Sequence, residues 1–482
     1  MEARRRRRLL PGQRQKQRLD RVFNPRSIAF YGASNNPLKM GTGQLATLIM
    51  QGFSGPIYPV HPTEDTVLGL KAYRSIADVP EVPDLVVMVL PTGIVPGLLD
   101  DCGKAGVRAA IVVSGGFREV RGEGFALERE LIDVCHKYDI TMIGPNCIGV
   151  SNFNIGLNTT YFPYEQEPGG LTVISQSGTY SCHIYGHTKK TGIRLSHTVS
   201  VGNSSIVDLS ECLEYFADDE STKSIALYIE GIPDGDRFMR AALKAVARKP
   251  VVALYVGGTG PGARAGMSHT GALAGDDSIY DGMLKQVGIR RAESIEDLLD
   301  WTWAQSTQPK APGKRLAVLT NAGGPAASMA DTATRLGLEV PVFSDGLQKK
   351  LREFLPHTAA TVNPVDITFL LNFEWLYDGI PRTLMESDEV DGIVMYGVFG
   401  SLLFNTIQKA LGDRISYDME NIMPVYTRLL AEFAKFPSEY GKPLLVSSFW
   451  GRDDDALAFL TDSGIPVYPS PERAVKAFAS LT

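Results

Sequence analysis

The chain has 482 residues, of which 44% are hydrophobic and 21% charged, as in a globular protein of two to four domains. Its net charge of −6 argues against a nucleic-acid binder, and no apolar run approaches the roughly 20 residues that a membrane helix needs. The five cysteines form no CxxC pair and the seven histidines show no metal-ligand spacing. We therefore expect neither a disulfide framework nor a metal site, and a reducing cytoplasm is the simplest compartment.

The N-terminus is the one strongly basic region. Residues 1–25 hold nine basic and two acidic side chains, a local charge of +7 that leaves −13 for the rest. Such a run is typical either of an arm that contacts nucleic acid or anionic lipid, or of a solvated leader. We interpret residues 1–22 as a basic, flexible leader and expect neither nucleic acid nor membrane as a partner. Leu9 and Leu10 are too few for the apolar region of a secretory signal.

From residue 23 the sequence alternates short β-rich runs with amphipathic stretches, which is the pattern of a parallel α/β fold. The first series predicts a five-stranded, doubly wound domain over residues 23–150. Its strands are expected at residues 27–31, 57–60, 85–90, 109–113 and 141–144.

Two further α/β series follow, over residues 151–308 and 309–482. Residues 153–170 are rich in Asn, Thr, Pro and Gly and indicate a linker, and a polar stretch at 305–314 marks the second boundary. The strands are expected at residues 171–175, 197–201, 224–229 and 251–256, and then at 315–320, 392–395, 443–447 and 465–467.

The loop after the first expected strand has the composition of a phosphate-binding turn. Gly32, Ala33 and Ser34 directly follow the strand, and Gly41 opens a helical pattern. Exposed amides and the positive end of the helix favour a phosphate there, although a tight structural turn explains the residues as well.

The loop after the second strand argues against a dinucleotide site. It contains Pro59 and His61 but no acidic residue directly at the strand end, where a ribose-binding carboxylate is usual. A nucleotide-bearing ligand other than NAD fits better.

Three more strand-end loops of this domain are small, polar and rich in Pro or Gly, so that together they indicate a binding rim. The residues concerned are Pro91 and Thr92, then Ser114, Gly115 and Gly116, and finally Asn146 in IGPNCIG.

The second and third series open alike, with a strand, a small polar loop and a helix. The loops hold Ser175, Gln176, Ser177 and Gly178 in one series, and Asn321, Gly323 and Gly324 in the other. Both helix N-termini are suited to an anion, and either one alone is also an ordinary turn.

His269 lies among Gly, Ser, Thr and Ala residues, beyond a strand and a Gly-rich connection. Neutral imidazole is a competent nucleophile at pH 7. Glu230, at another strand end, is a suitable partner because a carboxylate fixes the tautomer and orientation of an imidazole. On spacing alone, a non-catalytic histidine and a surface salt bridge for Glu230 are the commoner explanations.

Eight short sequence motifs, taken in chain order, indicate which protein family this sequence resembles. They are NPRSIAFYGAS, GFREV, IGPNCIG, ISQSGT, YIEGIPDG, SHTGALAG, TNAGGP and NPVDIT. From about residue 23 onwards the sequence resembles the alpha subunit of ADP-forming acetyl-CoA and other acyl-CoA synthetases, relatives of succinyl-CoA synthetase. The resemblance implies a Rossmann-like CoA-binding domain followed by two flavodoxin-like domains of the succinyl-CoA synthetase type.

The resemblance also implies roles for the residues named above. CoA would lie along the loops at Gly32–Ser34, Pro59–His61, Pro91–Thr92 and Ser114–Gly116. His269 matches the phosphorylated histidine of the family and Glu230 its supporting carboxylate. Asn146 and the two helix-opening loops of the later domains would form the phosphate and acyl site.

The implied reaction interconverts a carboxylic acid, CoA and ATP with acyl-CoA, ADP and phosphate, through phosphohistidine and acyl phosphate. No segment resembles an ATP-grasp domain, so ATP/ADP and Mg²⁺ are expected on a separate beta subunit, in an α2β2 assembly by family resemblance. The sequence does not name the acid, nor does it decide between ADP and GDP. Two alternatives stay open: a non-catalytic CoA or acyl-CoA sensor, and an NAD-dependent oxidoreductase.

Overall fold

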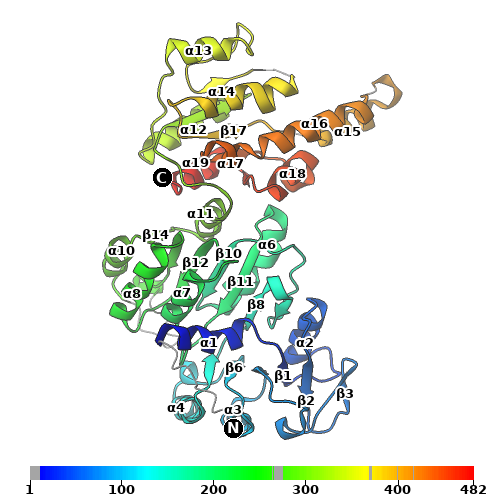
Figure 1. Cartoon of the computed structure of the whole chain (residues 1–482), viewed down its shortest axis with the longest axis vertical. Helices are drawn as coiled ribbons and strands as arrows, with labels where there is room; N and C mark the ends of the chain where they lie inside the picture. The colour runs from blue at the N-terminus through cyan, green and yellow to red at the C-terminus, as the bar shows by residue number, and fades with distance from the viewer. Residues whose placement is uncertain (1–10, 263, 265–274, 369–371, 399, 416) are drawn as a thin grey trace, which may run out of the picture. The chain divides into compact units, whose positions relative to one another are not determined.

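The computed structural model describes residues 11–262, 264, 275–368, 372–398, 400–415 and 417–482 (Figure 1). These residues form two compact units. The first unit comprises residues up to 186 together with 194–292, and the second comprises 187–193 with 293–482. No helix within the described ranges is long and apolar enough to cross a membrane.

The first sheet of the first unit is parallel throughout, in the order β2-β1-β5-β6-β7. Its strands are β1 (Ile28–Tyr31), β2 (Ile57–Val60), β5 (Leu85–Met88), β6 (Ala109–Val112) and β7 (Thr141–Ile143). Four of them are buried at every residue, which is why they form continuous apolar runs in the sequence. The order reverses between β1 and β5, and such a switch point is where a doubly wound sheet binds ligands.

Three helices connect these strands. They are α2 (Met40–Met50), α3 (Val95–Ala105) and α4 (Glu123–Tyr138), and a small hairpin of β3 (Thr66–Val67) and β4 (Leu70–Lys71) follows β2. α3 ends at Gly106 and α4 at Asp139, each in the left-handed conformation that commonly closes a helix. The predicted doubly wound arrangement of this domain is confirmed.

The second sheet has the order β14-β13-β12-β10-β11-β8-β9. Its parallel strands are β10 (Leu171–Ser175), β11 (Leu195–Ser200), β12 (Ser224–Ile229), β13 (Val251–Tyr255) and β14 (Arg290–Arg291). Its helices are α5 (Gly178–Cys182), α7 (Leu209–Ala217), α8 (Gly235–Val246) and α10 (Asp277–Gln286). The division between the two units falls inside α6 (Ile184–Thr191), after residue 186. The switch point lies between β10 and β12.

The structure differs from the linker expected at residues 153–170. β8 (Val150–Asn152) pairs antiparallel with β11, and β9 (Leu157–Asn158) pairs antiparallel with β8. A short 3₁₀ turn, η4 (Phe153–Ile155), joins them. The start of the expected linker therefore extends the second sheet, since its short polar strands find an edge to pair with.

Helix α1 (Pro11–Phe23) also differs from expectation, because residues 11–22 were assigned to a flexible leader. Leu19, Val22 and Phe23 recur at helical spacing and are at most 1% exposed. α1 lies between the two sheets of this unit, against β6 and β7 on one side and β8 and α7 on the other (Figure 1). Basic residues dominate the composition of this segment, so composition alone does not reveal its apolar stripe.

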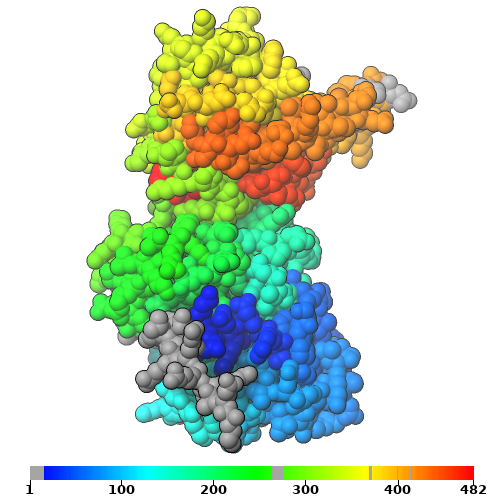
Figure 2. All heavy atoms as spheres, in the orientation of Figure 1, coloured from blue at the N-terminus to red at the C-terminus, as the bar shows by residue number. Residues whose placement is uncertain are grey.

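The second unit contains a parallel sheet in the order β16-β15-β17-β18-β19. Its strands are β15 (Leu316–Thr320), β16 (Val365–Asp366), β17 (Gly392–Tyr396), β18 (Leu444–Ser447) and β19 (Val467–Tyr468). Its helices are α11 (Ile295–Thr307), α12 (Gly323–Arg335), α13 (Asp345–Arg352), α14 (Ile380–Glu386), α15 (Ser401–Leu411), α16 (Met419–Phe433), α17 (Phe436–Tyr440), α18 (Asp455–Asp462) and α19 (Pro471–Ala479). α15 and the start of α16 project from the body of this unit (Figures 1 and 2).

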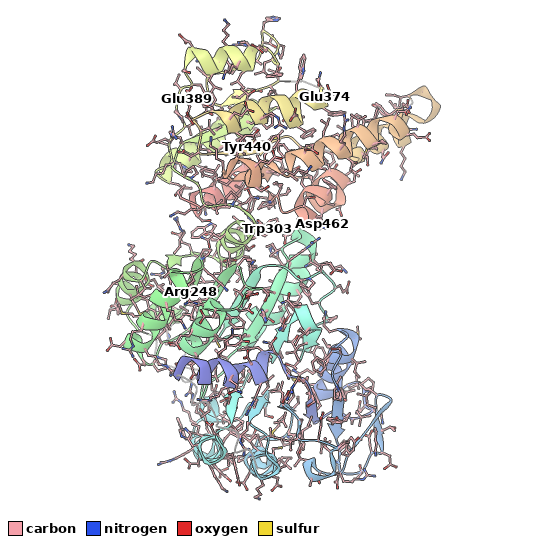
Figure 3. All side chains as sticks on the ribbon, in the orientation of Figure 1. Arg248, Trp303, Glu374, Glu389, Tyr440 and Asp462 are labelled. Carbon is pink, nitrogen blue, oxygen red and sulfur yellow. The ribbon has the colours of Figure 1, made fainter. Side chains whose placement is uncertain are left out.

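The expected boundary at residue 308 lies later than the division in the structure. α11 belongs to the second unit, where Arg473 donates to both oxygens of Asp300 at 2.7 and 2.9 Å. Trp303, which is labelled in Figure 3, packs its indole against the ring of Tyr468, with ring centroids 5.4 Å apart. Burial raises the pKa of Asp300 to about 6, although Arg473 opposes the shift. These contacts fasten α11 to the third α/β series.

Candidate active site

The loop after β1 requires glycine at its first position. Gly32 has a φ of +93°, and a Cβ there would lie 1.9 Å from the carbonyl oxygen of Val89 at the end of β5. A Cβ on Gly41 would lie 2.4 Å from the oxygen of Gly32, so the first turn of α2 also meets this loop backbone to backbone. Thr42 Oγ1 accepts from the Ser34 amide at 3.1 Å and donates to the Ser34 carbonyl at 2.9 Å. Bare backbone thus lines the switch point of the first sheet, with Ala33 buried beneath it.

The loops after β5 and β6 are fastened to each other. Ser114 Oγ accepts from the amide of Leu90 at 3.0 Å and donates to its carbonyl at 2.6 Å. Thr92 Oγ1 donates to the carbonyl of Gly115, and a Cβ on Gly116 would lie 2.5 Å from that hydroxyl. Three predicted CoA-binding loops therefore end side by side at one sheet edge, with Pro91 exposed at the rim.

The turn after β2 lies beside them but has a structural explanation. Pro59 is buried in β2, and His61 Nδ1 accepts from the amides of Thr63 at 3.3 Å and Glu64 at 3.0 Å. The amide of Asn35 donates to Glu64 Oε2 at 3.2 Å, which joins this turn to the β1 loop. His61 thus shapes the turn.

The connection at residues 144–149 links this rim to the second sheet. The amide of Asn146 donates to the Ser114 carbonyl at 2.9 Å. Two residues later, the Ile148 carbonyl accepts from Gln44 Nε2 at 2.8 Å, and Ile148 Cβ would lie 3.3 Å from a Cβ on Gly178. The same short segment therefore contacts the CoA rim and the start of α5.

Glu119 and Asn203 belong to this rim but did not stand out as site residues in the sequence. Glu119 Oε1 accepts from the amides of Gly116 at 2.5 Å and Phe117 at 3.1 Å, and its Oε2 accepts from Asn203 Nδ2 at 2.8 Å. Burial raises the pKa of Glu119, but these hydrogen bonds together hold the pKa below its ordinary value. The GFREV motif contained the signal for Glu119, and no local pattern marks Asn203.

At the switch point of the second sheet, the β10 loop holds the end of β12. Gln176 Oε1 accepts from the amides of Glu230 at 2.6 Å and Gly231 at 3.0 Å, and its Nε2 donates to the Gly231 carbonyl at 2.9 Å. Ser175 Oγ accepts from the Ser177 amide at 3.0 Å and donates to its carbonyl at 2.7 Å. The structure therefore holds the backbone of Glu230 against the side chain of Gln176. Their expected roles, catalytic for Glu230 and in the phosphate and acyl site for Gln176, stay predictions.

His269 lies outside the described residues, but the chain that follows it is anchored near Glu230. Tyr255, at the end of β13, donates its hydroxyl to the carbonyl of Gly275 at 2.9 Å. Its ring stacks on Tyr280 at 3.7 Å between centroids, and the hydroxyl of Tyr280 accepts from the amide of Ile232 at 2.9 Å. Gly275 and the loop that begins with Glu230 are thus held at neighbouring strand ends.

The β15 loop of the second unit repeats the geometry of the β10 loop. Thr320 Oγ1 accepts from the Ala322 amide and donates to its carbonyl, both at 3.0 Å. Asn321 Nδ2 donates to the carbonyl of Gly397, just beyond β17, at 3.3 Å. Gly323 and Gly324 open α12 on an exposed first turn. Bare amides at a helix N-terminus suit an anion, so the phosphate site at Gly323 and Gly324 stays a prediction.

Comparisons with known proteins agree with this arrangement. A CoA binding domain model matches residues 26–152, and a succinyl-CoA ligase like flavodoxin domain model matches residues 168–304. The alpha subunit of ADP-forming acetate–CoA ligase II from Pyrococcus furiosus is 37% identical over 464 residues, covering 96% of this chain and 97% of that protein. The ADP-forming 4-hydroxybutyrate–CoA ligase from Nitrosopumilus maritimus is 32% identical, and the match covers 95% of this chain and 63% of that protein.

A solved structure covers the same span. Dinucleotide-forming acetyl-coenzyme A synthetase 1 from Ca. Korarchaeum cryptofilum, in complex with phosphate and ADP, is 35% identical with a TM-score of 0.83, covering 96% of each chain. A CoA-binding domain followed by succinyl-CoA ligase-like domains defines the class of acid–CoA ligases. Within it, the chain belongs to the family of ADP-forming acetate–CoA ligase alpha subunits. The predicted family and fold class are confirmed, whereas the site residues remain predictions.

Proposed function

We propose that this chain is the CoA-binding and phosphohistidine subunit of an ADP-forming acyl-CoA synthetase. It interconverts a carboxylic acid, CoA and ATP with acyl-CoA, ADP and phosphate. The observation that carries the proposal is the continuous path from the Gly32 loop through residues 144–149 to the Gln176–Glu230 pair. Reacting groups held on neighbouring loops need little movement to meet.

In the acid-activating direction, an imidazole nitrogen of His269 attacks the γ-phosphorus of ATP, and the bond to the leaving ADP oxygen breaks. Glu230 orients the imidazole and balances the charge that develops on it. A carboxylate oxygen then attacks the phosphorus of phosphohistidine, and the P–N bond breaks to give acyl phosphate. CoA thiolate attacks its carbonyl carbon and releases phosphate. The amides at Ser177–Gly178 stabilise the phosphoryl oxygens.

In this proposal ATP binds to a partner subunit and not to this chain. The relatives that match over 97% of their length are named alpha subunits, which supports a separate beta subunit. We propose that this beta subunit is an ATP-grasp protein that binds ATP with Mg²⁺, in an α2β2 assembly. We place CoA in residues 23–150, the phosphohistidine loop in 151–308 and the second phosphate-binding helix in 309–482. All five cysteines are free and buried, which fits a reducing cytoplasm.

The test is phosphorylation of the full chain, mixed with its beta subunit and γ-labelled ATP. Wild-type protein acquires an acid-labile, base-stable label, His269→Ala acquires none, and Glu230→Gln labels roughly a hundredfold more slowly or worse. Two exposed residues serve as matched controls, His136→Ala on α4 and Glu220→Gln after α7, and both label normally. Label that persists in His269→Ala refutes the proposal. An unlabelled wild-type chain that still binds CoA favours the non-catalytic sensor. A panel of carboxylic acids, assayed with the same αβ complex, then identifies the substrate.

A further inference from the structure

A cavity of about 430 Å³ lies between α1 and the first sheet, and the proposed reaction makes no use of it. Its walls include Asp20 and Arg21 from α1, Arg26 ahead of β1, Asp84 ahead of β5 and Arg108 ahead of β6. All three strand positions are at the amino ends of the strands, whereas the CoA rim follows their carboxyl ends. A four-residue strand spans about 13 Å, so the cavity lies on the opposite edge of the sheet from the proposed CoA site.

The acidic groups of the cavity are already engaged. Asp84 accepts from Arg26 Nε at 2.8 Å and Arg26 Nη2 at 3.1 Å, and also from the Arg26 amide at 3.0 Å. That pairing holds the pKa of Asp84 below its ordinary value, although burial opposes it. Asp20 accepts from the hydroxyl of Tyr215 at 2.8 Å. Arg26 engages both oxygens of Asp84, and Arg21 acts on this carboxylate only as a further charge that lowers its pKa.

Two guanidinium groups of the cavity make no ion pair within the described part of the chain. Arg108 donates through one nitrogen, Nη1, to the carbonyls of Gly103 at 3.1 Å and Val107 at 2.7 Å. Within the residues that the structure describes, the side chain of Arg21 makes no hydrogen bond or ion pair and acts on Asp84 only as a more distant charge. Both side chains are half-buried, so their charges are less screened than those of fully exposed arginines. A guanidinium presents a planar fork of donors that matches a carboxylate or phosphate.

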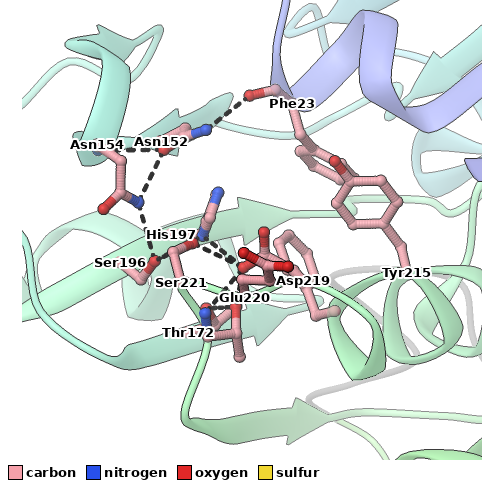
Figure 4. A network of polar contacts seen from close by, with 12 residues as sticks. Phe23, Asn152, Asn154, Thr172, Ser196, His197, Tyr215, Asp219, Glu220 and Ser221 are labelled. Atoms are coloured by element: carbon pink, nitrogen blue, oxygen red, sulfur yellow. Dashed lines mark hydrogen bonds and ion pairs between the residues drawn. The ribbon is translucent and has the colours of Figure 1, made fainter. Parts of the chain in front are cut away.

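The α1 wall of the cavity is held in place by a polar network, of which Figure 4 shows the hydrogen bond from Asn152 to the Phe23 carbonyl. Asn152 Nδ2 donates to the Phe23 carbonyl at 3.0 Å and to Asn24 Oδ1 at 2.9 Å. Asn24 Nδ2 in turn donates to the Tyr215 hydroxyl, which donates to Asp20. The ring of Phe23 packs 4.9 Å from that of Tyr215. The last turn of α1 therefore approaches a preformed wall, which lowers the entropic cost of binding.

We propose that this cavity, the amino-edge pocket, binds a small ligand in which a carboxylate or phosphate group adjoins a compact apolar part. Arg21 and Arg108 bind the anionic group, and Val82, which is 54% exposed on the rim, contacts the apolar part. The volume is in the range of small-molecule sites. Because the pocket is built from α1 and the strand starts of the CoA-binding domain, its ligand is separate from the reactants.

Equilibrium dialysis of the full chain against labelled inorganic pyrophosphate, and separately against labelled malonate, tests the pocket and distinguishes phosphate from carboxylate. The key variant is Arg21→Gln/Arg108→Gln. The control, Arg129→Gln/Arg240→Gln, removes the same charge from exposed positions on α4 and α8. For at least one of the two anions, we expect wild type and the control to bind one more molecule per chain than the key variant binds.

The single variant Arg21→Gln decides the case if the double variant folds poorly, because the change removes no side-chain hydrogen bond or ion pair among the described residues. We expect it to weaken the additional equivalent at least fivefold while its Kd for CoA stays unchanged. The proposal is overturned if the key variant and wild type bind the same number of equivalents, or if the control loses as much as the key variant. It is equally overturned if Arg21→Gln binds as tightly as wild type.

Discussion

Replacing Gln176 with leucine tests whether this side chain positions the Glu230 loop. The amide of Gln176 accepts two hydrogen bonds, from the backbone of Glu230 and Gly231, and donates a third to the Gly231 carbonyl. Leucine fills a similar volume but satisfies none of the three groups. The predicted result is a loosened carboxyl end of β12, with the rest of the sheet intact.

The magnitude follows from the three bonds. A net contribution of about 1 kcal/mol for each gives about 3 kcal/mol of local stability. Each 1.4 kcal/mol is tenfold in an equilibrium constant, so the local opening constant should rise roughly a hundredfold. The loss is confined to the loop because β12 itself is paired on both sides, to β10 and to β13.

Hydrogen exchange measured by mass spectrometry on peptides that span residues 226–234 provides the assay. Gln176→Leu should accelerate exchange at Glu230 and Gly231 by one to two orders of magnitude, without change at Ala226 or Leu227. Gln176→Glu is the matched control, because a carboxylate still accepts from both amides although it no longer donates to Gly231. Unchanged exchange in Gln176→Leu, or a Gln176→Glu variant that exchanges as fast as Gln176→Leu, would refute the reasoning.

Three further predictions concern the first unit. Gly32→Ala should abolish CoA binding in calorimetry and destabilise the unit by at least about 2 kcal/mol, because its Cβ collides with the Val89 carbonyl. The control is Gly69→Ala, at a φ of +80° with no atom within 4 Å of the added Cβ. It should cost only the backbone strain of about 1–2 kcal/mol and leave the affinity for CoA unchanged. Burial lowers the pKa of His197 from 6.5 to about 4, so between pH 6.5 and pH 4 the unfolded chain binds a proton that the folded chain does not. The free energy of unfolding, measured by urea denaturation with circular dichroism, should therefore fall by about 3 kcal/mol from pH 7 to pH 4. His197→Asn should remove this contribution to the pH dependence. Glu119→Ala should lower CoA affinity about tenfold by releasing two loop amides, and an unchanged Kd would exclude Glu119 from positioning the rim.

The sheets could be predicted because most of their strands are fully buried. Runs such as Leu85–Met88 and Ala109–Val112 are apolar at every position and stand out without any periodicity. The strands β8 and β9 could not be found in the same way. Their residues are largely polar, and only β8 pairs with β11, while β9 pairs with β8. The place of β8 in the sheet therefore depends on a neighbour distant in the sequence.

The candidate site likewise contains residues with a local sequence signal and residues without one. Glycine and hydroxyl residues at strand ends carry a local signal, because the chain must turn there and expose its amides, so the loops at Gly32 and Ser177 could be predicted. The contact of Asn203 with Glu119 joins residues 84 positions apart, from separate sheets, and no spacing rule predicts it. The apolar stripe of α1 was obscured for a different reason, since three apolar positions were outnumbered by charged and amide side chains.

The loops after β10 and β15 show why their residue types could be predicted even without knowledge of the fold. In each, a strand-final hydroxyl, Ser175 or Thr320, accepts from the amide two residues on and donates to the carbonyl of that residue. The next residue, Gln176 or Asn321, reaches across to the neighbouring strand end that lies beyond the switch point. A helix then begins on glycine, so its first amides stay uncovered. Each residue type has one role in such a turn: the hydroxyl stabilises the backbone of the turn, and the side-chain amide binds the neighbouring strand end. The glycine leaves the first N–H groups of the helix free for an anion.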